Sequence, residues 1–207
     1  ISEIDLSHNP ELLELNIETN LLSSIDLSAQ KKLQTLNIGT NRAIRSISVP
    51  CPEKLTNFSI GDTRITEFDL SAMPKLQVFG GNNLPLDFLP DFSRHPHMRE
   101  IHICTTGGAS WINDPHYTCQ FEELESINLC AFPLDTIDFS KNTKLRMLWI
   151  SIANKLEEID LSAAPDMEVL EFADCEKLKR IYVHPNVVID NLKTLRGSCR
   201  AEILHKP

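Results

Sequence analysis

Cysteine and histidine are the residues of this chain best suited to metal binding or acid–base chemistry. The chain contains six cysteines and seven histidines. No two cysteines have the Cys-x-x-Cys spacing of zinc or redox sites. The nearest histidines are His95, His97 and His102. The first two flank Pro96 in an expected turn, and His102 points outward from the next expected strand. We therefore expect no bound metal and no cofactor.

Catalytic signatures are missing from the sequence. It contains no Gly-x-Ser-x-Gly elbow, no phosphate-binding loop and no dinucleotide-binding fingerprint. Binding surfaces thus become the place to look for function, and we predict that the chain is not an enzyme.

Charge and hydropathy exclude two further classes of partner. The 29 acidic residues outnumber the 20 basic ones, which gives a net charge of −9. Binding to nucleic acid needs a Lys/Arg stripe that neutralises phosphates, and none is seen. No run of about 18 apolar residues offers a membrane span.

The elements that must position any site repeat with a short period. An apolar residue, two others, an apolar residue, one other and a third apolar residue recur along the chain. Successive copies are 21 or 22 residues apart, except for one step of 26. The copies begin at Leu12, Leu33, Leu55, Leu76, Met98, Leu124, Leu145 and Met167. Each copy predicts one strand of a stacked coil.

A second set of half-repeats falls between these strands and reads Asp, apolar residue, Ser. Its copies begin at Asp5, Asp26, Asp69, Asp91, Asp138 and Asp160. A ladder of carboxylates could bind calcium. However, Asp and Ser also accept hydrogen bonds from nearby backbone N–H groups in turns, and Pro often follows the Ser here. We favour turn formation over calcium binding.

The first full turn, Leu12-x-x-Leu15-x-Ile17-x-x-Asn20-x-Leu22, resembles the eleven-residue core of the leucine-rich-repeat family. The short period is similar to that of secreted proteins of Bacteroidetes type, distant cousins of the internalins. The resemblance implies a right-handed, mainly β solenoid of about eight coils. It has a parallel sheet on one face and short extended or 3-10 return segments on the other. The family's turn asparagine is kept at Asn20 and Asn41, but Thr63, Thr106, Phe132 and Cys175 stand at later equivalents.

The repeat divides the chain into residues 1–183, a solenoid, and residues 184–207, a capping segment for its last coil. Because the chain begins within a repeat, at Ile1, we expect further sequence upstream. The solenoid is interrupted at 105–123, where we expect the Asp-apolar-Ser half to be missing. Insertions in solenoids become loops, and loops often carry function. Trp111 and Tyr117 in this insertion are candidate contact residues, or else they cover the core where the half-repeat is lost.

A disulfide is a further candidate feature. Cys104 and Cys130 each follow the last apolar residue of neighbouring strands, and equivalent positions on adjacent parallel strands are about 5 Å apart. Cys119, on the loop between them, is the competing partner. Unpaired thiols are the alternative, because the cysteine content suits either an oxidising or a reducing compartment.

The outward face of the sheet is the main candidate binding surface. Small polar residues dominate its first half, whereas Trp149 is flanked by Met147, Val169 and Ile152. Apolar residues around an outward tryptophan are typical of a binding hot spot. The predicted binding residues are Trp149, Met147, His102, Asn128, Val169, Trp111 and Tyr117.

These observations predict a protein-binding module. With only two Trp and two Tyr in the chain, a glycan is the less favoured partner, and a structural spacer is the alternative function. An extracellular or cell-surface location, including a lipoprotein, is implied by the family resemblance alone.

Overall fold

The computed structural model describes residues 1–86, 90–104, 114–130, 134–195 and 199–206. The chain forms two compact units, Ile1–His95 with His102–Gly107, and Pro96–Ile101 with Gly108–Pro207. Both are parallel β solenoids, and together they contain about eight turns with almost no helix, which confirms the predicted fold class. Among the described residues, no helix is long and apolar enough to cross a membrane.

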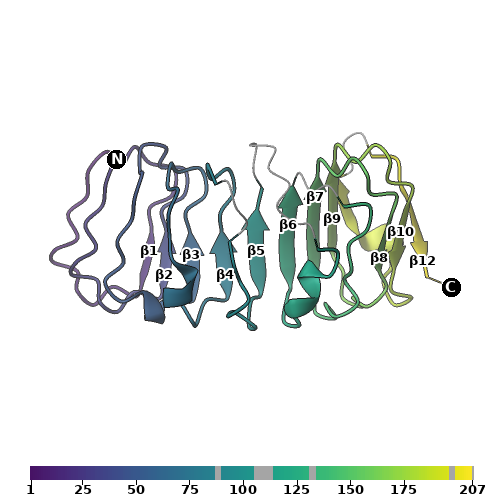
Figure 1. Ribbon diagram of the computed structural model, residues 1–207, viewed down its shortest axis with the longest axis horizontal. Helices are drawn as coiled ribbons and strands as arrows, with labels where there is room; N and C mark the ends of the chain where they lie inside the picture. Colours follow the sequence, from purple (N-terminus) through teal and green to yellow (C-terminus); the bar gives the residue numbers. More distant parts are fainter. Residues whose placement is uncertain (87–89, 105–113, 131–133, 196–198, 207) are drawn as a thin grey trace. The chain divides into compact units, whose positions relative to one another are not determined.

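The first unit is a stack of parallel strands (Figure 1). They are β1 (Glu14–Asn16), β2 (Thr35–Asn37), β3 (Asn57–Ser59) and β4 (Val78–Gly80). Their register aligns Leu15, Leu36, Phe58 and Phe79 as the inward ladder that the repeat predicts. Two 3-10 turns, η1 (Pro52–Lys54) and η2 (Leu70–Ala72), lie on the return side.

The second unit contains two parallel sheets. One consists of β6 (Ser126–Cys130), β7 (Met147–Ser151), β9 (Val169–Ala173) and β11 (Lys193–Leu195). The other is built from return segments and consists of β8 (Glu158–Leu161), β10 (Arg180–Val183) and β12 (Glu202–His205). The 3-10 turns are η3 (Tyr117–Gln120) and η4 (Ile189–Asn191), while β5 (Glu100–Ile103) spans the division between the units. Return segments of the last coils are therefore strands rather than loops.

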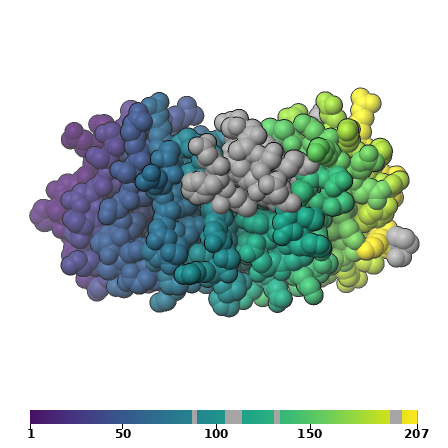
Figure 2. All heavy atoms as spheres, viewed as in Figure 1, coloured from purple at the N-terminus to yellow at the C-terminus, as the bar shows by residue number. Residues whose placement is uncertain are grey.

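Alternate strand residues fill the core of each unit, because successive side chains of a strand point to opposite faces. In the first unit, aromatic rings stack from coil to coil, with ring centroids 6.2 Å apart for Phe58 and Phe79 and 5.4 Å apart for Phe79 and Phe92. The coils of each unit pack directly against one another (Figure 2). Each coil thus buries an apolar edge that it could not bury alone.

A side chain holds the turn after several of the described strands, and in the case of Asn41 this side chain is fully buried. The Nδ2 group of Asn41 donates to the carbonyl oxygens of Ile38, at 2.9 Å, and of Ile17 in the preceding coil, at 3.0 Å. Its Oδ1 atom accepts the backbone N–H of Leu22 at 3.1 Å. Cys175 occupies the equivalent place in the second unit, where its Sγ lies 3.7 Å from the Ile150 oxygen and 3.3 Å from that of Ala173. A thiol can therefore replace the asparagine as donor to these carbonyl groups.

The Asp-apolar-Ser halves form turns, as predicted. In all six, the Asp Oδ1 accepts the backbone N–H of the Ser at 2.8–2.9 Å. The expectation that this half is missing from the interrupted coil is wrong. Asp114 accepts the N–H of His116 at 2.9 Å in the same way, so Pro115 and His116 take the places of the apolar residue and the Ser. The turn survives because it needs only the Asp carboxylate and a backbone N–H.

The tail from residue 184 continues both sheets, since β11 pairs with β9 and β12 pairs with β10. Val187 and Leu192 are buried as expected for an inner face, whereas Val188 is 59% exposed. That this tail caps the solenoid stays a prediction.

Replacing Asn41 with Ala should destabilise the fold strongly. The change leaves buried carbonyl groups and one buried N–H without their partner, which costs about 3 kcal/mol of unfolding free energy. Urea denaturation measures the loss. Asn20→Ala is the matched control and should cost less, because Asn20 holds the equivalent turn but is only half-buried. Equal losses for the two variants would contradict the argument.

Acid should weaken the fold through the Asp turns. Hydrogen bonds from the Ser71 hydroxyl and N–H lower the pKa of Asp69. The pKa values of the five other Asp carboxylates are also lowered, with hydrogen bonds from the following Ser among the causes. A lowered pKa in the folded state gives stability that is present above the unfolded pKa and is lost as pH falls through the folded one. We expect the Tm to fall between about pH 5 and pH 2. Asp69→Asn, which keeps the acceptor but does not titrate, should reduce that fall; an unchanged pH profile would contradict this assignment.

Candidate functional site

The outward face of the second unit's first sheet carries the predicted apolar patch. Trp149 on β7 lies between Asn128 on β6 and Glu171 on β9, and Met147 pairs with Val169. All five side chains are partly exposed. The structure therefore brings together Trp149, Met147, Asn128 and Val169 on one surface. We call Met147, Trp149, Val169 and Ile152 the apolar patch.

Ile152 gives this patch an unusual backbone. Its φ angle is +56°, and its side chain is 41% exposed. Among the described residues, six coils have a residue with positive φ at this point, and the other five are Thr19, Thr40, Asp62, Asn83 and Asp174. Asn and Asp tolerate this conformation best, while β-branched residues are strained in it, Thr19 and Thr40 as well as Ile152. Ile152 differs from the two threonines because its exposed side chain is aliphatic.

The remaining predicted binding residues lie elsewhere. His102 is partly exposed on β5 and belongs to the first unit. Tyr117 lies in η3, on the return side, and packs edge-on against Phe121 with ring centroids 5.6 Å apart. It is thus not part of the sheet face. Trp111 lies outside the described residues.

The cysteines occupy different environments. Cys104 and Cys130 are both partly exposed and belong to different units, and their pairing stays a prediction. Cys119 is a free thiol whose Sγ donates to the backbone oxygen of Asp138 at 3.5 Å.

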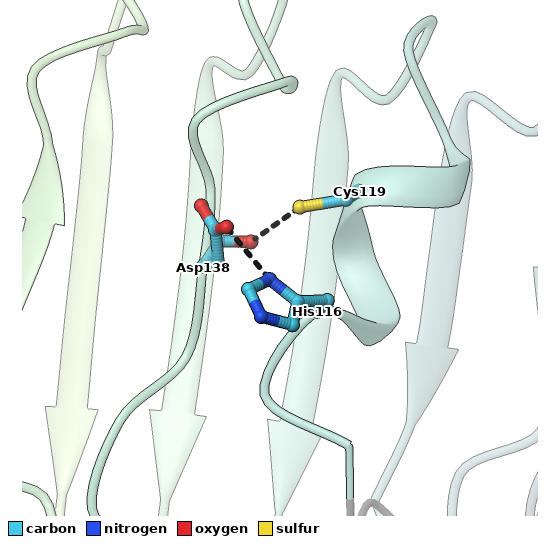
Figure 3. A group of neighbouring side chains, drawn as sticks. All are labelled: His116, Cys119 and Asp138. Carbon is cyan, nitrogen blue, oxygen red and sulfur yellow. Dashed lines mark hydrogen bonds and ion pairs between the residues drawn. The ribbon is translucent and has the colours of Figure 1, made fainter.

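A second candidate site lies on the return side, where His116, Cys119 and Asp138 meet (Figure 3). The Nδ1 atom of His116 is 2.9 Å from Oδ2 of Asp138, and the ligand atoms of the three residues all lie within 4.8 Å of one another. Imidazole nitrogen, sulfur and carboxylate oxygen are the donor types that zinc prefers. We call these three residues the return-side cluster.

A local lengthening of the chain builds this cluster. From the turn Asp to the first apolar strand residue there are seven positions in the regular coils, but ten from Asp114 to Leu124. The extra residues form η3, with His116 as the residue before its first position. A 3-10 helix has about three residues per turn, so side chains three positions apart face the same way. His116 and Cys119 therefore project together toward the next coil, which supplies Asp138.

The charge state of the cluster follows from its contacts. Hydrogen bonds from the Ser140 N–H and hydroxyl, together with His116, hold the pKa of Asp138 well below its usual range. Burial raises the pKa of the Cys119 thiol, and its contact with Asp138 raises it further. The cluster therefore combines a carboxylate with a protonated thiol.

A groove of about 580 Å³ adjoins the cluster. It is lined by His116 and Asp138, and by residues of β8, β10 and the tail, among them Ile159, Tyr182 and Lys206. Lys206 forms an ion pair with Asp160 on the groove's rim, with its Nζ 2.5 Å from Oδ2. The cluster is thus open to solvent and ligands on one side.

Local sequence motifs do not reveal this cluster, because Asp138 is not close to the other two ligands in sequence. His116 and Asp138 are 22 positions apart, which is one coil. The signal that could have revealed them is the repeat itself, since residues one period apart become neighbours in a solenoid.

Comparison with solved structures identifies the fold as that of leucine-rich-repeat proteins. The functional domain of InlJ from Listeria monocytogenes, which includes a cysteine ladder, matches with a TM-score of 0.65 and 21% sequence identity, over 97% of this chain and 47% of that one. A leucine-rich-repeat protein of Leptospira interrogans matches with a TM-score of 0.50 and 14% identity, over 88% and 51%. The chain thus spans about half the length of these chains. No family model and no curated protein matches.

Ile152→Asn should stabilise the protein. Asn adopts positive φ more readily than Ile does, so the change should raise the unfolding free energy by about 1 kcal/mol. Urea denaturation measures the gain. Asp174→Asn, at the equivalent position of the next coil, is the control and should leave stability nearly unchanged. A loss of stability in Ile152→Asn would show that Ile152 serves packing after all.

Proposed function

We propose that this chain is a non-catalytic protein-interaction module that binds its partner through the apolar patch on β7 and β9. The observation that carries the proposal is Ile152, a strained and exposed aliphatic residue that follows Trp149 by three positions at the end of β7. Where a residue breaks the local rule without benefit to the fold, function is the usual reason.

The chemistry of the patch suits a protein partner. Trp at the centre of aliphatic side chains is the composition of an interface hot spot, where burial of a few large residues supplies most of the affinity. Asn128 and Glu171 on either side of Trp149 provide a polar rim. Sugar-binding faces usually stack several aromatic rings against the ligand, whereas this patch has one, which makes a glycan the weaker candidate.

The fold supports the same proposal. A stack of rigid coils holds the outward side chains of neighbouring strands in fixed register, so a partner meets a preorganised surface. A structural spacer would need the rod but no such patch. The internalin-like neighbour supports a secreted or cell-surface location, which belongs to this proposal and not to the structural findings.

Trp149→Ala tests the proposal. The wild-type chain and the variant are immobilised side by side, and the proteins captured are quantified by mass spectrometry. Each captured protein is then purified and titrated directly. Truncating a hot-spot tryptophan costs about 2 kcal/mol or more, so we expect the Kd of the true partner to rise by roughly 30-fold.

Two variants complete the design. Asn16→Ala changes the equivalent outward position in the first unit and should leave binding intact. Ile152→Asn should lose binding while the protein becomes more stable, which separates binding from folding. If Trp149→Ala retains the partner, or if no protein binds the wild-type chain at all, the proposal is wrong and the spacer function is favoured.

A further inference from the structure

From the return-side cluster we infer a site for one zinc ion, with His116 Nδ1, Cys119 Sγ and Asp138 Oδ2 as its ligands. A metal ion there has no part in the proposed sheet-face binding. It would lie in the other half of the coil, so a test of one proposal does not decide the other.

Geometry is the first argument. Tetrahedral zinc with Zn–N and Zn–O of about 2.0–2.1 Å and Zn–S of about 2.3 Å holds its donors roughly 3.3–3.6 Å apart. The cluster's Nδ1 and Oδ2 are 2.9 Å apart, and no two of its ligand atoms are more than 4.8 Å apart. Completing the set requires Nδ1 and Oδ2 to separate by roughly 0.4 Å and the thiol to move by roughly 1 Å, and rotations of the His116 and Cys119 side chains supply both shifts.

The supporting hydrogen bonds are the second argument. Ligand residues of metal sites are usually held by further hydrogen bonds that fix their orientation. Here Oδ1 of Asp138 accepts the Ser140 N–H at 2.8 Å, which leaves Oδ2 directed at His116. The backbone of His116 is fixed by its bond to Asp114, and the Thr118 hydroxyl donates to the carbonyl oxygen of Asp138. These contacts hold the Asp138 side chain and the His116 backbone in place before a metal arrives.

The third argument is the exchange of contacts on binding. The proton of the Cys119 thiol leaves to solvent, and a Zn–S bond replaces the S–H contact with the Asp138 carbonyl. That carbonyl keeps its hydrogen bond from Thr118, so no buried acceptor is orphaned. The hydrogen bond between His116 Nδ1 and Asp138 Oδ2 gives way to Zn–N and Zn–O bonds, and the neutral imidazole then carries its proton on Nε2. The groove beside the cluster gives water access to the fourth position of the metal. The donor set of one nitrogen, one sulfur and one oxygen favours zinc over calcium or magnesium, which take oxygen ligands.

Titration of the reduced, metal-stripped chain with zinc chloride in a calorimeter tests the inference. We expect one ion per chain. Cys119→Ser keeps a donor for the Asp138 carbonyl, and Asp138→Asn keeps the acceptor for Ser140, so both variants should fold. Each should weaken zinc binding by more than about 100-fold, since even loss of a supporting contact costs 10- to 100-fold. Cobalt serves as a second probe, and its thiolate charge-transfer absorption should vanish in Cys119→Ser.

A matched control lies in the same unit. His97 and Glu123 form another exposed His–carboxylate pair, with an Nδ1–Oε1 distance of 2.9 Å, and each histidine side chain is 69% exposed. His97→Ala should leave zinc affinity unchanged, as should Cys51→Ser, which removes a thiol of the first unit. Full zinc affinity in Cys119→Ser, or an equal loss in His97→Ala, would overturn the assignment, as would the absence of a cobalt–thiolate band in the wild-type chain.

Discussion

The turn that follows a strand, as at Asn41, is the constraint on which the rest of the structure depends. A coil changes direction there, and its carbonyl groups turn into the core, where no water can satisfy them. Asn41 meets this demand by bonding to its own coil and to the coil before it. Leaving a buried polar group unsatisfied costs more free energy than one hydrogen bond contributes to stability. The hydrogen bonds of Asn41 therefore constrain how the coils stack. Where Cys175 takes over, the donor is kept while the sequence signature disappears.

Stacking at a fixed register then decides which residues become neighbours. Side chains about one period apart meet across the coil boundary, as in the exposed ion pairs of Lys32 with Glu11, Arg146 with Glu168 and Lys179 with Glu157. Such exposed pairs add little stability. The same geometry also joins His116 to Asp138, and it holds Trp149 beside Glu171. A solenoid thus turns a repeat in sequence into columns of side chains, and a single changed residue alters its column at one place only.

The repeat was enough to predict the fold, the inward ladder and the turns, because each coil solves the same packing problem with the same residue types. It also placed Trp149, Met147 and Val169 on one surface. It failed at the interrupted coil, where Asp114 keeps the turn but Pro115 and His116 hide the pattern. It also could not reveal the strain at Ile152, since the left-handed conformation of that position is visible only in the backbone. Local sequence indicates which backbone conformation each residue favours, whereas these features depend on the position of the residue in the complete coil.

Regularity itself makes the exceptions informative. In a repeat protein, most positions are explained by contacts with the neighbouring coils, so a residue that departs from its column without improving those contacts needs another cause. Ile152 departs by accepting backbone strain, and His116 with Cys119 departs through extra residues that the regular coils lack. These departures lie in opposite halves of the coils, and variants at distant sites act independently on stability. Selection on a solenoid can therefore shape one face without disturbing the other, which lets a uniform scaffold accommodate the two proposed sites.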